Sequence, residues 1–319
     1  MTAVPSGGSR FGRNGSRLPD LGFRITTGTF AWLVVGLILA LGALLLVNGG
    51  EAFSKFGLGF LTGTKWDPIA GLYGALPFII GTIGSALIAI VIATPIGLLT
   101  AIFLAELAPR RVAIPLTFAI ELLAAIPSVV FGLWGVFILS PFLQSTVESW
   151  LVGLFGWIPI FAGPPFGIGM FAAGVILTLM ILPTIIAISR DVISAVPDNQ
   201  REAMLALGAT RWETIRRAVL PYARSGIYGA VILGLGRALG ETMAVTMVIG
   251  NRPEVPNSIF DSSQTIASQI ATTFNEASIG LQTSALIALG LVLLVITMSL
   301  NVGARLLVWR VTKPGKGAA

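Results

Sequence analysis

The chain contains no cysteine and no histidine among its 319 residues, and only 11% of them are charged. The missing cysteine excludes disulfides and thiolate nucleophiles, and the missing histidine excludes imidazole bases and the commonest zinc ligands. Lysine is also scarce, and a Walker A nucleotide-binding motif needs a lysine followed by Ser or Thr. The four lysines, followed by Phe, Trp, Pro and Gly, are Lys55, Lys65, Lys313 and Lys316. We therefore predict that the chain is not an enzyme and does not hydrolyse ATP by this route.

Hydrophobic residues make up 55% of the chain, whereas soluble domains carry about twice the charged fraction found here. This composition indicates an all-α protein that crosses a membrane several times. The net charge of +6 raises the question of a nucleic-acid partner. The basic residues lie mostly at the ends of apolar runs, so membrane topology explains the charge better, and no nucleic acid is expected.

Six apolar runs are long enough, at about 20 residues each, to cross a bilayer. The expected spans are Phe30–Val47, Leu76–Leu104, Ile114–Leu139, Met170–Ile188, Gly226–Gly250 and Thr283–Val308. A further apolar stretch, Ser149–Ala162, is short and interrupted by Pro159. An interfacial or re-entrant segment is the better interpretation of that stretch.

The distribution of lysine and arginine predicts which side of the membrane each loop faces. Residues 1–25 are expected to form a disordered basic tail, 26–312 the transmembrane domain and 313–319 a second tail. With both tails inside, sixteen of the 20 basic residues lie in cytoplasmic segments and three lie outside. The sequence therefore predicts a multi-pass protein of the plasma membrane with both termini in the cytoplasm. The first apolar run is long for a signal peptide and lacks a cleavage site, so we expect it to remain as a helix.

The most polar segment between two spans is residues 198–221. Asp198 is placed to cap a helix over Asn199–Leu207, which would end at Gly208. A second helix would begin with a capping box formed by Thr210 and Glu213. Pro221 is expected to end that helix. The segment is thus predicted to be a cytoplasmic helical hairpin.

Three interpretations of this hairpin differ in the partner that it would contact. A DNA-binding helix-turn-helix has similar geometry, but the membrane spans on both sides disfavour it. A loop that lies on anionic lipid headgroups would explain the charge. It would not explain the capped geometry or the small residues Ala203, Ala206 and Gly208, which favour close contact with a protein surface.

The hairpin resembles the EAA coupling loop of importer-type ABC transporter permeases, whose pattern is EAA, three residues, G, nine residues and I-x-L-P. The matching residues are Glu202, Ala203, Gly208, Leu220 and Pro221. Met204 and Ala218 depart from the pattern. The resemblance implies a type I ABC importer permease whose coupling loop, about 190–225, inserts into a groove of a separate ATPase subunit.

An arginine and a glutamate, Arg237 and Glu241, lie inside the fifth expected span. Charged groups are costly at this depth and usually have a function. Four residues apart on one helix, they would share a face and could form a structural ion pair. The alternative is an anion pathway in which Arg237 faces a water-filled cavity, with the glycines at 234, 236 and 240 allowing close approach.

The runs Gly234–Asn251 and Glu121–Gly135 narrow the resemblance to the phosphate-specific ABC permeases of the PstC family. That resemblance implies that Arg237 and Glu241 take part in phosphate translocation. Glu121 is a third carboxylate that looks buried from its sequence context. Either a pathway role or an interfacial position fits it.

The resemblance also implies which partners complete the transporter. They are a paralogous permease, two ATPase subunits that bind ATP and Mg²⁺, and an external phosphate-binding protein. No cofactor or metal is expected in this chain. Three alternatives remain: a permease of the same architecture for molybdate or sulfate, a secondary carrier using Glu121 or Glu241 as a proton relay, and a membrane scaffold.

Overall fold

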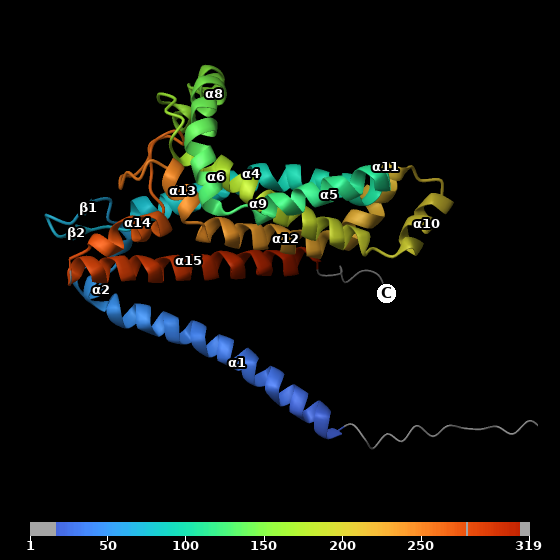
Figure 1. Ribbon diagram of the computed structural model, residues 1–319, viewed down its shortest axis with the longest axis horizontal. Helices are drawn as coiled ribbons and strands as arrows, with labels where there is room; N and C mark the ends of the chain where they lie inside the picture. Colours follow the sequence, from blue (N-terminus) through green and yellow to red (C-terminus); the bar gives the residue numbers. More distant parts are fainter. Residues whose placement is uncertain (1–16, 279, 313–319) are drawn as a thin grey trace, which may run out of the picture. The chain divides into compact units, whose positions relative to one another are not determined.

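The computed structural model describes residues 17–278 and 280–312, so the tails expected at 1–16 and 313–319 lie outside the described residues. The chain forms helices almost throughout (Figure 1). In chain order they are α1 (Arg17–Asn48), α2 (Gly50–Phe56), α3 (Gly59–Thr62), α4 (Leu76–Ile102), α5 (Arg110–Ala125), α6 (Ser128–Trp134), α7 (Ser140–Phe142), α8 (Ser149–Phe155), α9 (Met170–Ser194), α10 (Asp198–Ala206), α11 (Arg211–Thr214), α12 (Leu220–Gly240), α13 (Met243–Val248), α14 (Ile266–Thr273) and α15 (Leu281–Thr312). The shorter helical turns are Phe103–Leu107, Gly135–Leu139, Leu143–Glu148, Pro159–Phe161, Ile215–Val219 and Phe274–Glu276.

The chain divides into two units, residues 1–47 and 48–319. The first unit consists of α1, in which residues 21–48 are long and apolar enough to span a membrane. The expectation of a disordered tail up to residue 25 is wrong for residues 17–25, because helix α1 already includes them. The helix can begin before the apolar run because the amides of its first turn, which have no partners within the helix, can bond to water there.

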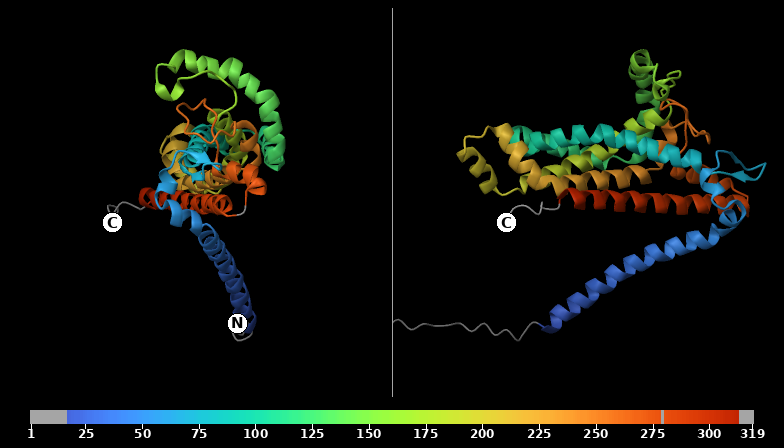
Figure 2. Two further views of the ribbon diagram at one scale, coloured as in Figure 1. Left: turned by 90° about the vertical axis from the view of Figure 1, so that its left-hand side faces the viewer. Right: turned by 180° about the vertical axis from the view of Figure 1, so that it is seen from behind.

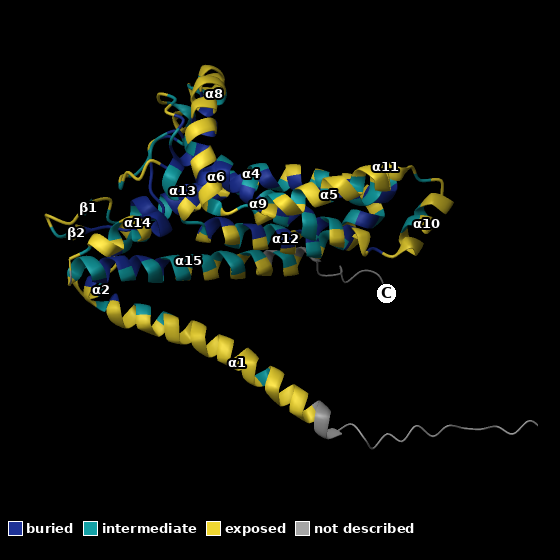
Figure 3. Ribbon diagram, viewed as in Figure 1, coloured by how far each residue is buried: buried dark blue, intermediate teal, exposed yellow. Residues whose placement is uncertain are grey.

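In the second unit, α4, α9, α12 and α15 run side by side, with α9 packed between α4 and α12 (Figures 1 and 2). Helix α9 is the most deeply buried of the long helices (Figure 3). Glycines allow its close contacts with α4. A Cβ on Gly97 would lie 2.8 Å from Ile185, and a Cβ on Gly174 would lie 2.4 Å from Ile88. Small residues bring helix backbones together in membrane proteins, where packing rather than hydrophobic exclusion holds helices together.

Six helical stretches of the described chain are long and apolar enough to span a membrane, which confirms the predicted number. They are Leu21–Asn48, Leu76–Leu107, Ser128–Phe155, Met170–Ser194, Arg211–Gly240 and Leu281–Arg310. The limits of the third and fifth differ most from the prediction. The fifth begins 15 residues earlier than expected and ends ten earlier.

The third span predicted over Ile114–Leu139 is wrong because the helix breaks inside it. Helix α5 ends at Ala125, and Ile126 and Pro127 both have extended backbone. A residue before proline is pushed out of the helical region by the proline ring. A new helical stretch of 28 residues, Ser128–Phe155, begins after the break. Ser149–Phe155 is its last part, so no separate helix begins at Ser149. The interfacial or re-entrant position expected for Ser149–Ala162 stays a prediction.

The stretch Ser128–Phe155 leaves the bundle and curves away from it (Figure 2). Two wide π-type turns, Gly135–Leu139 and Leu143–Glu148, interrupt its α-helical bonding. The following loop folds back onto it, because the Gly167 amide donates a 2.8 Å hydrogen bond to the buried Glu148 carboxylate. Gly167 has a φ of +69° and lies against the Ser140 carbonyl, so only glycine fits there.

At the end of the bundle opposite α10, two short antiparallel strands form a hairpin (Figure 1). Strands β1 (Trp66–Asp67) and β2 (Leu72–Tyr73) pair Trp66 with Tyr73 and Asp67 with Leu72. The Asp67 carboxylate accepts hydrogen bonds from the amides of residues 69 and 70, which closes the turn locally.

Candidate functional site

The first helix of the predicted cytoplasmic hairpin is α10. Its predicted cap is wrong: Pro197 occupies the N-cap position, and no side chain caps the first amides. Asp198 lies within the first turn instead, where its carboxylate accepts a 3.1 Å hydrogen bond from Arg201. An acidic residue in the first turn still favours the helix through its interaction with the helix dipole.

The end of α10 confirms the predicted role of Gly208. This residue has a φ of +81°, in the left-handed region that favours glycine. Its amide donates to the carbonyl of Leu205 at 2.9 Å, and the next amide, of Ala209, donates to the carbonyl of Met204 at 3.1 Å. These two bonds form a Schellman motif, which satisfies the free carbonyls at the helix end.

The predicted capping box is also confirmed. The Glu213 amide donates to the Thr210 hydroxyl oxygen at 3.3 Å, and the Thr210 amide donates to the Glu213 carboxylate at 2.9 Å. Two amides that would otherwise lack partners are thus satisfied reciprocally. The second helix of the hairpin therefore starts where its sequence predicts.

Pro221 does not end that helix, so this prediction is wrong. Helix α11 continues through the π-type turn Ile215–Val219 into α12, and the combined helix runs over 30 residues from Arg211 to Gly240. Proline in a helix lacks an amide hydrogen and its ring crowds an earlier carbonyl. The wider turn directly before Pro221 shifts the bonding register and accommodates the ring.

Arg201 holds the hairpin to the bundle, a role that sequence reasoning missed. Its guanidinium forms a salt bridge with Glu106 at 2.7 Å, and a second nitrogen, Nε, donates to the same carboxylate at 3.2 Å. It also donates to the carbonyls of Ile193 and Val196, at the end of α9. The hydrogen bond to Glu106 is the main cause that raises the pKa of Arg201. One side chain therefore joins α10 to the ends of α4 and α9.

The residues that carry the resemblance to coupling loops lie mainly on the open surface of the hairpin. Glu202, Ala203, Gly208 and Pro221 are exposed, and Leu220 is half-buried. Two large apolar side chains of the same hairpin, Leu207 and Trp212, are exposed as well, at 84% and 58%. An exposed apolar surface rimmed by charged residues is typical of a protein-contact site.

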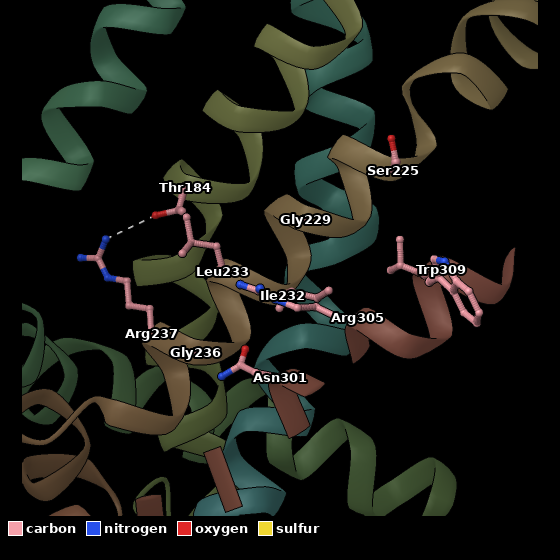
Figure 4. Close-up of a pocket in the computed structure, with 11 residues that line it drawn as sticks. Thr184, Ser225, Gly229, Ile232, Leu233, Gly236, Arg237, Asn301, Arg305 and Trp309 are labelled. Atoms are coloured by element: carbon pink, nitrogen blue, oxygen red, sulfur yellow. Dashed lines mark hydrogen bonds between the residues drawn. The ribbon is translucent and has the colours of Figure 1, made fainter. Parts of the chain in front are cut away.

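Arg237, on α12, faces a cavity of about 1050 Å³ (Figure 4). Its guanidinium donates a 3.3 Å hydrogen bond to the hydroxyl of Thr184 on α9. In the part of the chain that the structure describes, Arg237 forms no ion pair. The side chains around it come from three helices. The residues lining the cavity are Thr184, Ser225, Gly229, Ile232, Leu233, Gly236, Arg237, Asn301, Arg305, Val308 and Trp309.

Glu241 does not share a helical face with Arg237, contrary to the prediction. Helix α12 ends at Gly240, and Glu241 follows with extended backbone. Its carboxylate accepts a 3.3 Å hydrogen bond from the amide of Ala244 in α13. Among residues 17–278 and 280–312, no ion pair joins Glu241 to Arg237. The structure thus removes the ion-pair interpretation and leaves the Arg237 guanidinium open to the cavity.

The third candidate, Glu121, lies on α5 and is exposed, so its interpretation as a buried carboxylate is wrong. The described side chains of α5 include no buried residue. Neither Glu121 nor Glu241 lines the cavity of Arg237. The structure therefore does not gather the three charged candidates into one site. It brings Arg237 together with Thr184, Asn301 and Arg305 instead.

Comparisons with known proteins agree with this architecture. Residues 93–313 match the family described as "Binding-protein-dependent transport system inner membrane component". The "Phosphate transport system permease protein PstC" of Mesorhizobium japonicum is 47% identical over 92% of this chain and 91% of its own length. The protein of the same name from Haemophilus influenzae is 47% identical over 90% of this chain and 92% of its own.

Solved structures of ABC transporters share the fold. A chain of a bacterial alginate ABC transporter superposes with a TM-score of 0.59 and 18% identity, covering 92% of this chain and 96% of its own. A chain of the MetNI methionine ABC transporter superposes with a TM-score of 0.54 and 17% identity. The superposition covers 78% of this chain and all of the other. At such identities the likeness concerns the fold alone.

Together, the fold and the match to the family define a multi-pass membrane permease subunit of the type I ABC importers. Subunits of this class do not themselves catalyse a reaction. With 47% identity across nearly its whole length, the chain belongs to the PstC family of permeases.

Proposed function

We propose that this chain is a membrane subunit of an ATP-driven importer of inorganic phosphate and forms half of the translocation pathway. The observation that carries the proposal is Arg237, which lies in a helix long enough to span a membrane and faces a cavity. Among the described residues it forms no ion pair. A guanidinium offers planar paired donors that suit the oxygens of phosphate. The names of the relatives support phosphate as the substrate.

The same helix supplies a mechanical link. Arg237 and the second helix of the hairpin belong to one continuous helix, Arg211–Gly240. A displacement of the hairpin by an ATPase subunit would therefore be transmitted along this helix to the cavity. Closure of two ATP-loaded subunits would tilt the spans and open the pathway toward an external binding protein.

The complete transporter would contain a PstA-like permease, two PstB-like ATPase subunits and a PstS-like phosphate-binding protein. ATP and Mg²⁺ would bind to the ATPase subunits, with no cofactor in this chain. The coupling loop would contact the ATPase through Glu202, Ala203 and Gly208. The positive-inside distribution supports a plasma-membrane protein with both termini in the cytoplasm.

Uptake of radioactive phosphate into proteoliposomes that contain all subunits tests the proposal directly. We expect uptake that requires ATP and is not reduced by an excess of sulfate. Uptake without ATP would identify a secondary carrier instead. Competition by sulfate or molybdate would identify a permease of the same architecture for another oxyanion.

A further inference from the structure

A second arginine lines the cavity of Arg237. Arg305 lies on α15, 68 positions further along the chain, and its side chain extends toward Ile232 on α12 (Figure 4). Asn301, one turn before Arg305 on the same helix, also lines the cavity. Two cationic side chains from different helices thus face one space.

The packing of α12 against α15 fixes the relative levels of the two arginines. The Asn301 side-chain oxygen lies 3.9 Å from where a Cβ on Gly236 would be, so Asn301 is level with the residue next to Arg237. Arg305 follows four residues later, about 6 Å further along α15. That displacement is toward Gly229 and Ser225, the cavity residues nearer the hairpin (Figure 4).

The chemistry of the lining favours an anion. Within the described residues, no acidic side chain lines the cavity and Arg305 forms no ion pair. The Asn301 amide nitrogen donates to the Thr297 carbonyl at 2.9 Å, which holds this side chain against its own helix. Two arginines in an apolar surrounding are stabilised by a ligand that supplies negative charge and several acceptor oxygens.

We propose that Arg305 is a second oxyanion-binding residue, which takes the anion on the hairpin side of Arg237. This inference rests on the proposed function and adds a release position to its pathway. Conduction requires sites that bind strongly enough for entry and weakly enough for exit. Two arginines about one helical turn apart along the cavity let the anion leave one as it reaches the other. The ligand is inorganic phosphate; a lipid phosphate shares the same chemistry and is the source to be distinguished.

Phosphate uptake by the complete transporter in proteoliposomes tests the role of Arg305. We expect Arg305→Gln to lower ATP-dependent uptake about tenfold, as the loss of one charge-assisted contact would. Arg305→Lys keeps the charge and should retain clearly more uptake. Arg310→Gln is the matched control, because Arg310 is exposed on the same helix but does not line the cavity. The amount of assembled complex is measured for each variant.

The lipid composition distinguishes the two sources of phosphate. The phosphate of phosphatidylcholine is neutralised by its own choline group, so vesicles of this lipid alone carry no net negative charge. Phosphatidylglycerol, whose phosphate has no such counter-charge, is added in a second series. The Arg305→Gln defect should be equal in both series. A defect confined to the anionic vesicles would assign Arg305 to the lipid surface and overturn the proposal. Equal loss in Arg305→Lys and Arg305→Gln would also overturn it, since charge is the contribution claimed.

If Arg305→Gln does not assemble, Asn301→Asp provides a second test. A carboxylate four residues before Arg305 would pair with it and withdraw the charge from the cavity. We expect the same loss of uptake with normal assembly. Wild-type uptake in that variant would contradict the inference while leaving phosphate import itself established by the unmodified transporter.

Discussion

The charged residues of the hairpin and those of the cavity differ in how completely the chain itself satisfies them. In the hairpin, Arg201 contacts two carboxylates and two carbonyls, and Glu213 is bonded within its capping box. In the cavity, Arg237 contacts one hydroxyl at 3.3 Å, and Arg305 has no acidic partner among the described residues.

This difference separates charges that hold a geometry from charges that remain available to a ligand. Arg201 and Glu106 are 19% and 11% exposed, and their bidentate contact fixes the orientation of the two side chains. A guanidinium that is already saturated cannot take up an anion. Arg237 and Arg305, which are not saturated, are therefore the better candidates to bind the transported ion. Arg201, which is saturated, is the better candidate to transmit force from the hairpin to the bundle.

The largest expected effect on phosphate uptake comes from a substitution in the cavity. Arg237→Gln removes the charge and should reduce phosphate uptake by about a hundredfold, the upper range for one charged hydrogen-bonding group. Assembly should persist, because Arg237 forms no ion pair with any residue that the structure describes. Uptake by proteoliposomes measures the effect, with Arg24→Gln in α1 as a control outside the family-matched residues. Normal uptake by Arg237→Gln would assign that residue to packing.

The second-largest effect is expected from substitutions on the exposed face of the hairpin. Glu202→Ala combined with Gly208→Val should release the ATPase and uncouple hydrolysis from uptake. A side chain at the left-handed position of Gly208 costs about 1–2 kcal/mol and distorts the turn. Co-purification of the ATPase is the measurement. Gly71→Val imposes similar backbone strain in the β1–β2 turn, and should leave ATPase binding intact. Full coupling in the double variant would exclude the hairpin as the docking site.

The smallest effect is expected where the charges are paired. Glu106→Gln should weaken the attachment of α10 by about 1–3 kcal/mol and lower uptake several-fold per ATP hydrolysed. Faster hydrogen exchange of α10 amides would report the loosened attachment. Arg252→Gln is the control, since Arg252 and its partner Glu254 are 62% and 63% exposed and such pairs contribute little. If uptake falls in Glu106→Gln while the α10 amides exchange at the wild-type rate, the attachment is not the cause.

Elements set by neighbouring residues were predictable. The end of α10 at Gly208 and the capping box of Thr210 and Glu213 depend on hydrogen bonds that span at most five residues. The number of membrane-length helices was predictable as well, because it follows from apolar run length. The break at Pro127 was readable in principle, since proline restricts the residue before it, but the long apolar run concealed it.

The sequence alone determined three features of this protein. They are its membrane character, its capped hairpin and the presence of a charged residue, Arg237, inside a span. Only the tertiary structure decided the partners of each charge. Arg201 meets Glu106 from 95 residues away, and Arg237 meets Thr184 from 53 residues away. It also separated Arg237 from Glu241 by ending α12 between them, and brought Arg305 to the same cavity. Sequence spacing describes neighbours on one helix, whereas packing between helices decides which charges are satisfied and which remain open to a ligand.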